Sequence, residues 1–148
     1  MKNLLLSLTL LCLSLCFISC SSDDEDKKPP SDSLRSCDLW IVKNNDYSTK
    51  TDFESGSYNR STHTLTANTK DGVTHTFIFE FEEDKKVQTV TYNGVRYILD
   101  PTQYFHYYES DASYADTDFP HYGISASQTT VYSNEGTLKF NGDISFYQ

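Results

Sequence analysis

The clearest pattern along the chain is an alternation of apolar and polar side chains from Thr76 to Phe81. Phe77, Phe79 and Phe81 fall on one face of an extended strand, and the residues between them fall on the other. No window places apolar residues at the spacing of three and four that marks an amphipathic helix. The pattern therefore predicts a half-buried β-strand.

A second signal is a hairpin centred on Asn93-Gly94. Strands over Val87–Tyr92 and Val95–Leu99 flank this pair, which type I′ turns prefer because both central residues need a positive φ. The turn sets a register with Tyr92 opposite Val95. The predicted core face of the hairpin carries Val90, Tyr92, Val95, Tyr97 and Leu99.

The remaining apolar runs are short, and turn residues separate them. They predict strands over Leu39–Lys43, Thr62–Asn68, Tyr104–Tyr108, Gly123–Tyr132 and Thr137–Phe146, the last with a break at Asn141-Gly142. The abundance of Thr, Tyr and Phe also favours strands. We therefore expect a single all-β domain of about eight strands, closed as a small antiparallel barrel or folded as a sandwich.

The N-terminal segment has a different character. An apolar run from Leu4 to Ile18 follows a short polar start, and its 15 residues are too few for a membrane-spanning helix. This length suits the core of a signal peptide, which we assign to residues 1–19.

The residues that end this run suggest how the protein is anchored. Residues 17–20 read Phe-Ile-Ser-Cys and resemble a bacterial lipobox, although Phe17 stands where Leu is commoner. Cys12 and Cys16 follow leucines, which are too large for the cleavage pocket. The resemblance implies diacylation of Cys20, so that the membrane is a partner through these acyl chains. The alternative is an ordinary secretory signal.

An acidic tether follows the lipobox. Residues 21–26 read Ser-Ser-Asp-Asp-Glu-Asp and resemble the export tag of surface lipoproteins in the Bacteroides and Flavobacterium group. This resemblance implies an outer-membrane protein exposed on the cell surface; a solvated tether without a receptor is the alternative. We predict that residues 20–36 are lipidated and disordered, and that residues 37–148 form the domain.

Two shorter resemblances concern single sites. Residues 32–34, Asp-Ser-Leu, resemble the O-glycosylation acceptor of Bacteroides-type bacteria, which makes Ser33 a candidate modification site; a chance match is the alternative. Residues 34–40 resemble the opening strand of lipocalin-like domains, with Asp38 where that family usually has Gly. This resemblance implies that Trp40 plugs one end of a barrel, whereas a buried Trp that caps a sandwich is the alternative.

Charge excludes one class of partner. The chain has 12 Lys and Arg against 21 Asp and Glu, a formal charge of −9 and a pI of about 4.7. Removal of the signal peptide takes away Lys2 alone and leaves −10. A nucleic-acid partner requires clustered cations that neutralise phosphates, so we expect none.

Residue spacing offers little support for catalysis or metal binding. Cys37 is the only thiol left after Cys20, so it has no partner for an internal disulfide. The segment Asp111–Asp118 offers carboxylates to Ca²⁺, but it lacks the Gly and terminal Glu of a calcium loop, which favours a solvated loop. We predict no catalytic residue, no metal site and no cofactor. The histidines also lack compact ligand spacing; they are His63, His75, His106 and His121.

Aromatic content is the remaining functional signal. Eleven Tyr and, outside the signal peptide, eight Phe exceed the obvious need of a small core, although a β domain also covers its sheet faces with Tyr. The candidate ligand contacts are Trp40, Tyr104, Tyr107, Tyr108, Tyr114 and Tyr122. We predict a non-enzymatic binding module for a glycan, a small ligand or a protein. The alternatives are a structural or accessory envelope lipoprotein, an inhibitor of a secreted protein and, least favoured, a hydrolase.

The lipobox resemblance generates a direct test. Replacement of Cys20 with Ser removes the thiol that would carry the acyl chains, so Cys20→Ser should move the protein from the membrane fraction to the soluble fraction. Cys12→Ser and Cys16→Ser are matched controls that should leave it in the membrane fraction. Membrane retention of the Cys20→Ser protein would contradict the assignment.

Overall fold

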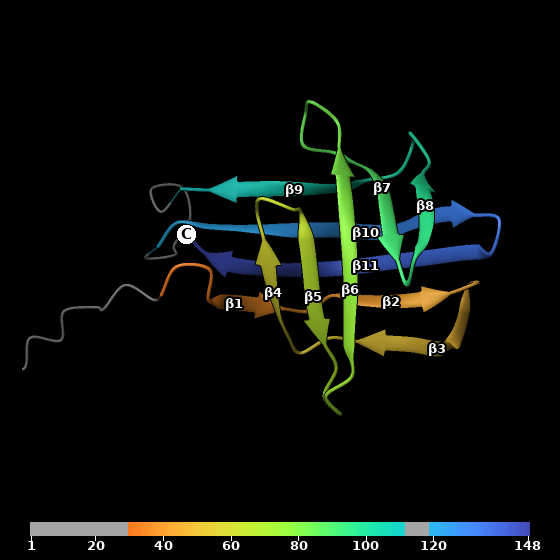
Figure 1. The fold of residues 1–148 in the computed structure, drawn as a ribbon, viewed down its shortest axis with the longest axis horizontal. Helices are drawn as coiled ribbons and strands as arrows, with labels where there is room; N and C mark the ends of the chain where they lie inside the picture. The colour runs from red at the N-terminus through yellow and green to blue at the C-terminus, as the bar shows by residue number, and fades with distance from the viewer. Residues whose placement is uncertain (1–29, 112–118) are drawn as a thin grey trace, which may run out of the picture.

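The computed structural model describes residues 30–111 and 119–148, and these residues form antiparallel strands without an α-helix (Figure 1). This confirms the predicted all-β class. The strands of the described residues are β1 (Leu34–Cys37), β2 (Trp40–Lys43), β3 (Asp46–Asp52), β4 (Ser55–Asn59), β5 (Thr64–Asn68), β6 (Thr74–Phe81), β7 (Val87–Tyr92), β8 (Val95–Leu99), β9 (Phe105–Ser110), β10 (His121–Ser133) and β11 (Gly136–Tyr147).

The two longest strands, β10 and β11, form the central ribbon of the sheet. The first half of β10 pairs with β9 and its second half with β8. The first half of β11 pairs with β2 and its second half with β1. β11 continues through the predicted break at Asn141-Gly142, where Gly142 has a φ of +97°. The bulge lies opposite it in β10, between Ala126 and Thr129.

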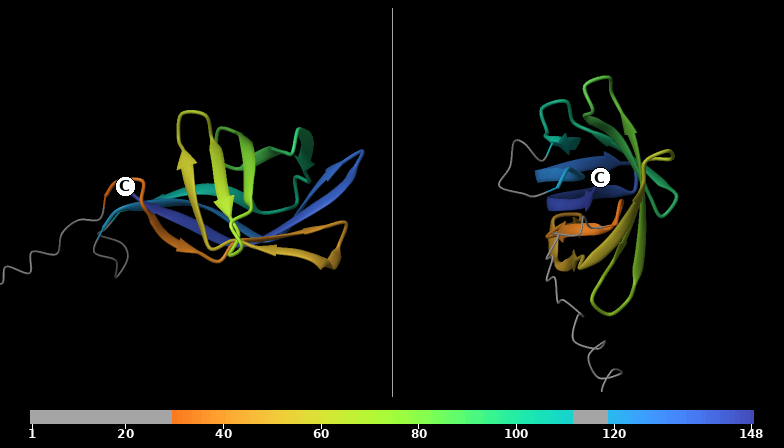
Figure 2. Two further views of the ribbon diagram at one scale, coloured as in Figure 1. Left: turned by 60° about the horizontal axis from the view of Figure 1, so that its bottom comes forward. Right: turned by 90° about the vertical axis from the view of Figure 1, so that its left-hand side faces the viewer.

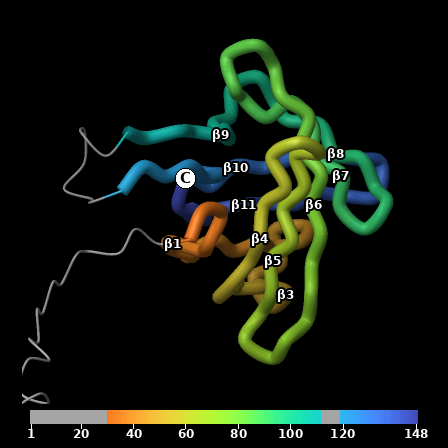
Figure 3. The backbone as a smooth tube through the Cα atoms, turned by 60° about the vertical axis from the view of Figure 1, so that its left-hand side comes forward, coloured from red at the N-terminus to blue at the C-terminus, as the bar shows by residue number. Residues whose placement is uncertain are grey.

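The sheet curls over itself into a half-barrel. From β10 the strand order continues through β8, β7, β6 and β5 to β4. Figure 1 shows β4 to β7 running across β9, β10 and β11, and Figures 2 and 3 show the two groups as facing layers. One continuous sheet therefore provides both sides of the core, which combines features of the predicted barrel and sandwich.

Aromatic rings fill the space between the layers. Phe77 and Phe79 of β6 are buried, as their alternation predicts. Phe79 meets Phe105 of β9 edge-on with ring centroids 5.5 Å apart, and Phe77 meets Phe140 of β11 at 5.6 Å. Phe105 and Phe140 lie 4.8 Å apart. Edge-to-face contacts of this kind add to the hydrophobic gain of burial, so the rings hold the curled sheet together.

The predicted hairpin is confirmed, including its strand ends and register. Tyr92 lies opposite Val95, and the φ angles of Asn93 and Gly94 are 51° and 78°. Two residues depart from the predicted pattern. Val87 is also buried in the core, because the register with β6 shifts at Phe81, and Thr89 is buried although it was predicted on the opposite face.

Three strands were not predicted, namely β1, β3 and β4. The β3 sequence is polar and shows no alternation of apolar side chains. It forms because Asn44 and Asn45, with φ values of 52° and 55°, make a tight turn that returns the chain onto β2. Asn tolerates this left-handed conformation, so the Asn pair is the signal that predicts this hairpin.

The folded region begins earlier than the predicted boundary at Cys37. The Asp32 N–H donates to the Tyr147 carbonyl over 2.8 Å, and the Tyr147 N–H donates to the Ser33 carbonyl over 2.9 Å. β1 then starts at Leu34 and pairs with β11. Backbone hydrogen bonds order this stretch, and they do not depend on an apolar side-chain pattern.

The turn at Gly94 provides a stability test. A Cβ at this position would meet no atom within 4 Å, so the cost of Gly94→Val comes from backbone strain at positive φ. We expect a loss of about 1–3 kcal/mol in the free energy of unfolding, measured by urea denaturation. Gly94→Asn is the matched control, and it should retain most of the stability because Asn tolerates this conformation. Equal stabilities for the Val variant and the parent would contradict the turn assignment.

Candidate functional site

The predicted ligand-contact residues do not form one surface. On β9, Phe105 and Tyr107 pack against the core, whereas Tyr104, His106 and Tyr108 lie on the opposite face. Tyr104 is 52% exposed, and its hydroxyl lies 2.9 Å from Nε2 of His106. Tyr114 lies outside the described residues.

Tyr108 covers a small buried polar region on the outer face of β9, β10 and β11. Its ring lies over Gly123, where an added Cβ would be 2.7 Å from the Tyr108 hydroxyl. Ser145 is fully buried beneath this region, with its hydroxyl 2.6 Å from that of Ser36. The Tyr108 ring therefore packs on the sheet, and little of its surface is left for a ligand.

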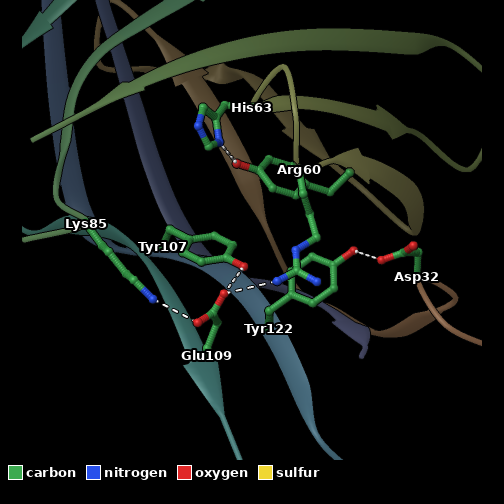
Figure 4. Close-up of polar contacts among 8 residues, drawn as sticks. Asp32, Arg60, His63, Lys85, Tyr107, Glu109 and Tyr122 are labelled. Atoms are coloured by element: carbon green, nitrogen blue, oxygen red, sulfur yellow. Dashed lines mark hydrogen bonds and ion pairs between the residues drawn. The ribbon is translucent and has the colours of Figure 1, made fainter. Parts of the chain in front are cut away.

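Two of the predicted ligand-contact residues do lie close together. Tyr107 of β9 and Tyr122 of β10 lie with ring centroids 6.0 Å apart, and Tyr58 of β4 lies 6.0 Å from Tyr107 and 6.1 Å from Tyr122. We call these three residues the tyrosine cluster (Figure 4 labels Tyr107 and Tyr122). Tyr58 was not predicted, because β4 is short and mostly polar.

Charged residues tie the tyrosine cluster to the surrounding loops (Figure 4). The Glu109 carboxylate accepts hydrogen bonds from Lys85 Nζ at 2.8 Å, from the Tyr107 hydroxyl at 2.8 Å and from the Arg60 guanidinium at 3.2 Å. The Arg60 guanidinium also lies 4.8 Å from the Tyr122 ring centroid, as in a cation–π contact. Glu109 thereby joins the β4–β5 turn and the β6–β7 loop to β9.

The N-terminal end of the fold is joined to the same cluster. The hydroxyl of fully buried Tyr122 donates to the Asp32 carboxylate over 2.6 Å. The Tyr58 hydroxyl lies 3.2 Å from Nδ1 of His63. A surface hollow of about 340 Å³ adjoins these groups, and Asp32, Tyr58 and Arg60 contribute to its lining. The hollow is open, whereas the rings behind it are packed together.

The protonation states of the cluster point to a structural role. Burial, with the help of Glu109, raises the pKa of Tyr107 to about 12, and burial also raises the pKa of Tyr58 and of Tyr122. The hydrogen bond from Lys85 holds the pKa of Glu109 below its ordinary value. At neutral pH the phenols are therefore protonated and Glu109 is ionised, so these groups are not tuned for proton transfer.

Trp40 lies away from the cluster, on the outer face of the sheet. Its neighbours Leu39 and Ile41 belong to the core, so the half-buried Trp40 ring faces outward and plugs no end of the half-barrel. It lies beside Tyr47 of β3, with ring centroids 6.2 Å apart and an interplanar angle of 56°. We call Trp40 and Tyr47 the outer aromatic pair. Tyr47 was not predicted, since its strand lacks an apolar pattern.

Two lysines flank the outer aromatic pair. Lys50 Nζ lies 5.3 Å from the Trp40 ring centroid and forms an ion pair with Asp52. Lys139 Nζ of β11 donates to the Tyr47 hydroxyl over 3.2 Å. The pair therefore combines apolar ring surface, ammonium groups and a carboxylate in one place.

Two further residues discussed above lie within the described residues: Cys37, the unpaired thiol, and Ser33, the candidate modification site. The Cys37 thiol donates to the Phe53 carbonyl over 3.3 Å, and burial raises the pKa of this thiol. It is therefore a thiol at neutral pH, which is the unreactive form. The Ser33 side chain is half-buried, and its hydroxyl bonds the Pro30 carbonyl at 2.5 Å.

Within residues 30–111 and 119–148, His, Cys, Asp and Glu form no group of three that could hold a metal ion. The candidate calcium segment lies outside the described residues except for Asp111. The described residues also contain no helix with the length and apolar character needed to cross a membrane.

Comparisons of the chain with protein-family models, with curated proteins and with solved structures found no match.

The Glu109 contacts generate a pH prediction. Because the folded-state pKa of Glu109 is lowered, Glu109 stabilises the fold above the pKa of the unfolded chain, and this stabilisation is lost as pH falls through the folded-state pKa. We expect Glu109→Gln to cost about 1 kcal/mol or less at neutral pH, as for solvent-screened ion pairs, and to weaken the loss of stability between about pH 5 and pH 3.

Urea unfolding across this pH range measures both effects. Glu135→Gln is the matched control, because Glu135 is an exposed turn residue for which no ion pair was found among the described residues. If the Glu109→Gln variant kept the full acid dependence of the parent, the assigned role of Glu109 would be wrong.

Proposed function

We propose that this protein is a lipid-anchored surface lipoprotein whose β domain is a non-enzymatic binding module with its ligand site on the exterior. Acyl chains on Cys20 hold it in the outer membrane, and the acidic run at residues 21–26 directs it to the cell surface. The sequence resemblances support this part of the proposal.

The packed aromatic interior is the observation that favours an exterior ligand site. Phe77 contacts Phe140 across the two layers, and Phe140 contacts Phe105 within its own layer, so side chains occupy the middle of the domain. A lipocalin-like carrier needs an apolar cavity instead. The outer aromatic pair, by contrast, offers ring surface to solvent, with Tyr47 55% exposed. This arrangement supports recognition of a glycan or protein surface rather than an enclosed small ligand.

The position of the tether agrees with this proposal. Asp32 and Ser33 are hydrogen-bonded to Tyr147, near the C-terminus, at one end of the long strands. The β2–β3 turn and the β10–β11 turn lie at the opposite end (Figure 1). With the anchor at the first end, the second end projects away from the membrane.

A specific observation favours the alternative of an accessory envelope lipoprotein or inhibitor that binds another protein. Ile98 of β8 and Tyr132 of β10 are paired in register and are 55% and 48% exposed, respectively. Adjacent exposed apolar side chains of this kind are typical of protein contacts. They lie on the outer face but on a different part of the sheet from the outer aromatic pair.

Full-length protein, purified in detergent and immobilised, would test the proposal against a panel of glycans and against envelope proteins. We expect saturable retention of at least one glycan or protein, unchanged in mass after incubation, and no retention of a lipophilic dye by the folded protein. Heat-unfolded protein is the control. Dye binding in the folded state would support an internal carrier, cleavage of a retained ligand would indicate an enzyme, and retention of nothing would contradict a binding module.

A further inference from the structure

We propose that Trp40, Tyr47, Lys50 and Lys139 form a binding site for an acidic glycan, meaning an oligosaccharide that carries carboxylate or sulfate groups. The proposal rests on the proposed binding function and specifies its ligand class. We call these four residues the outer glycan site. They come from β2, β3 and β11, which are adjacent strands of the sheet.

The two rings supply the surface on which a sugar would pack. The Trp40 side chain is half-buried and Trp40 pairs with Asp52 on one side and Asn141 on the other, so the position of the ring is set by a central strand. Tyr47 extends this surface onto β3, which is an edge strand of the sheet. The C–H faces of sugar rings are apolar and pack on aromatic faces, while the phenol hydroxyl provides a polar group.

The position of Lys139 leaves the Tyr47 ring accessible. Its ammonium nitrogen is 3.2 Å from the Tyr47 hydroxyl oxygen but 5.6 Å from the ring centroid. The ammonium thus lies beyond the hydroxyl edge and does not cover the face of the ring. Among the ion pairs of the described residues none involves Lys139, so its charge is available to an incoming anion.

Lys50 differs from Lys139 because it has an internal partner. Its ammonium lies over the Trp40 ring, 5.3 Å from the ring centroid, and its ion pair with Asp52 neutralises much of its charge there. The Asp52 carboxylate accepts hydrogen bonds, so together the pair suits sugar hydroxyl groups, whereas Lys139 suits an acidic substituent. The site therefore distinguishes two parts of one ligand, a sugar ring and its negative group.

The charge of the whole chain limits the kind of anion that fits. A formal charge of −9 repels densely charged polyanions such as nucleic acids at long range. One unpaired ammonium beside two rings matches a ligand with few acidic groups and much apolar ring surface. An acidic glycan has this composition.

The test uses full-length protein in detergent and a panel of acidic glycans, both uronate-bearing and sulfated, each with its methyl-esterified or desulfated counterpart. Biolayer interferometry at moderate salt measures the affinities. We expect the acidic member of at least one pair to bind more tightly than its neutral counterpart. Lys139→Gln should weaken binding of the acidic member about two- to fivefold and leave the neutral counterpart unchanged, because it removes one solvent-screened charge contact.

A second variant tests the rings. Tyr47→Ala should weaken both members of the pair, by about tenfold, because it removes a stacking surface. Lys86→Gln and Tyr104→Ala are matched controls, since Lys86 lies in the β6–β7 loop, Tyr104 precedes β9, and both side chains are exposed outside the site. Both variants should bind as the parent does. Urea unfolding establishes that each variant is folded; if Tyr47→Ala is not, Lys139→Gln alone decides.

The outcomes separate this inference from the broader proposal. Preference for neutral glycans, acidic binding unaffected by Lys139→Gln, or binding of a protein partner without any glycan would each overturn the acidic-glycan site and leave a binding module in place. Retention of neither glycans nor proteins would overturn both.

Discussion

β10 and β11 pair from His121 opposite Tyr147 to Ser133 opposite Gly136, and the strands on both sides attach to this ribbon. β9 and β8 follow one another along β10, and β1 and β2 follow one another along β11. The bulge opposite Gly142 separates the two halves of the ribbon. Because a bulge bends and twists its strand, it accompanies the change from one set of neighbours to the other. Both layers of the half-barrel therefore depend on hydrogen bonds to this ribbon.

The curl of the sheet also determines how the interior is filled. Aromatic side chains from β6, β9 and β11 meet between the layers and occupy the interior. Protein interiors are packed to the density of organic crystals, so such a core offers no room to a guest. Polar contacts beside the tyrosine cluster join the surrounding segments to one another. Glu109 links Arg60 and Lys85, and Tyr122 links to Asp32. This packing is the reason for placing the proposed ligand site on the outer surface.

Cations in the described residues differ in their partners. Arg60, Lys85 and Arg96 lie against carboxylates and connect loops or strands, whereas Arg35, Lys43 and Lys70 form no ion pair within these residues. Lys139 lies instead beside the hydroxyl of an exposed tyrosine. The charges of Arg60, Lys85 and Arg96 are compensated within the fold, whereas Lys139 forms no ion pair with the described residues and its charge is available to a ligand. This difference, rather than the number of exposed aromatic residues, is the basis for proposing a ligand class.

The all-β class, the alternating face of β6 and the hairpin of β7 and β8 could be predicted from the residue order, because side-chain period and turn chemistry are local properties. The sequence also shows that aromatic residues are abundant, but which of them meet depends on how distant strands pair. Tyr107 and Tyr122 come together because β9 pairs with β10, whereas Tyr104 and Tyr108 lie on the other face of the same strand. Tyr47 and Tyr58 were not predicted as site residues, because they lie on the polar strands β3 and β4, which join the sheet through backbone hydrogen bonds. Such bonds are common to nearly all residues, so apolar alternation cannot show which polar segments they will join, and for β3 only the Asn44-Asn45 turn gives a local signal.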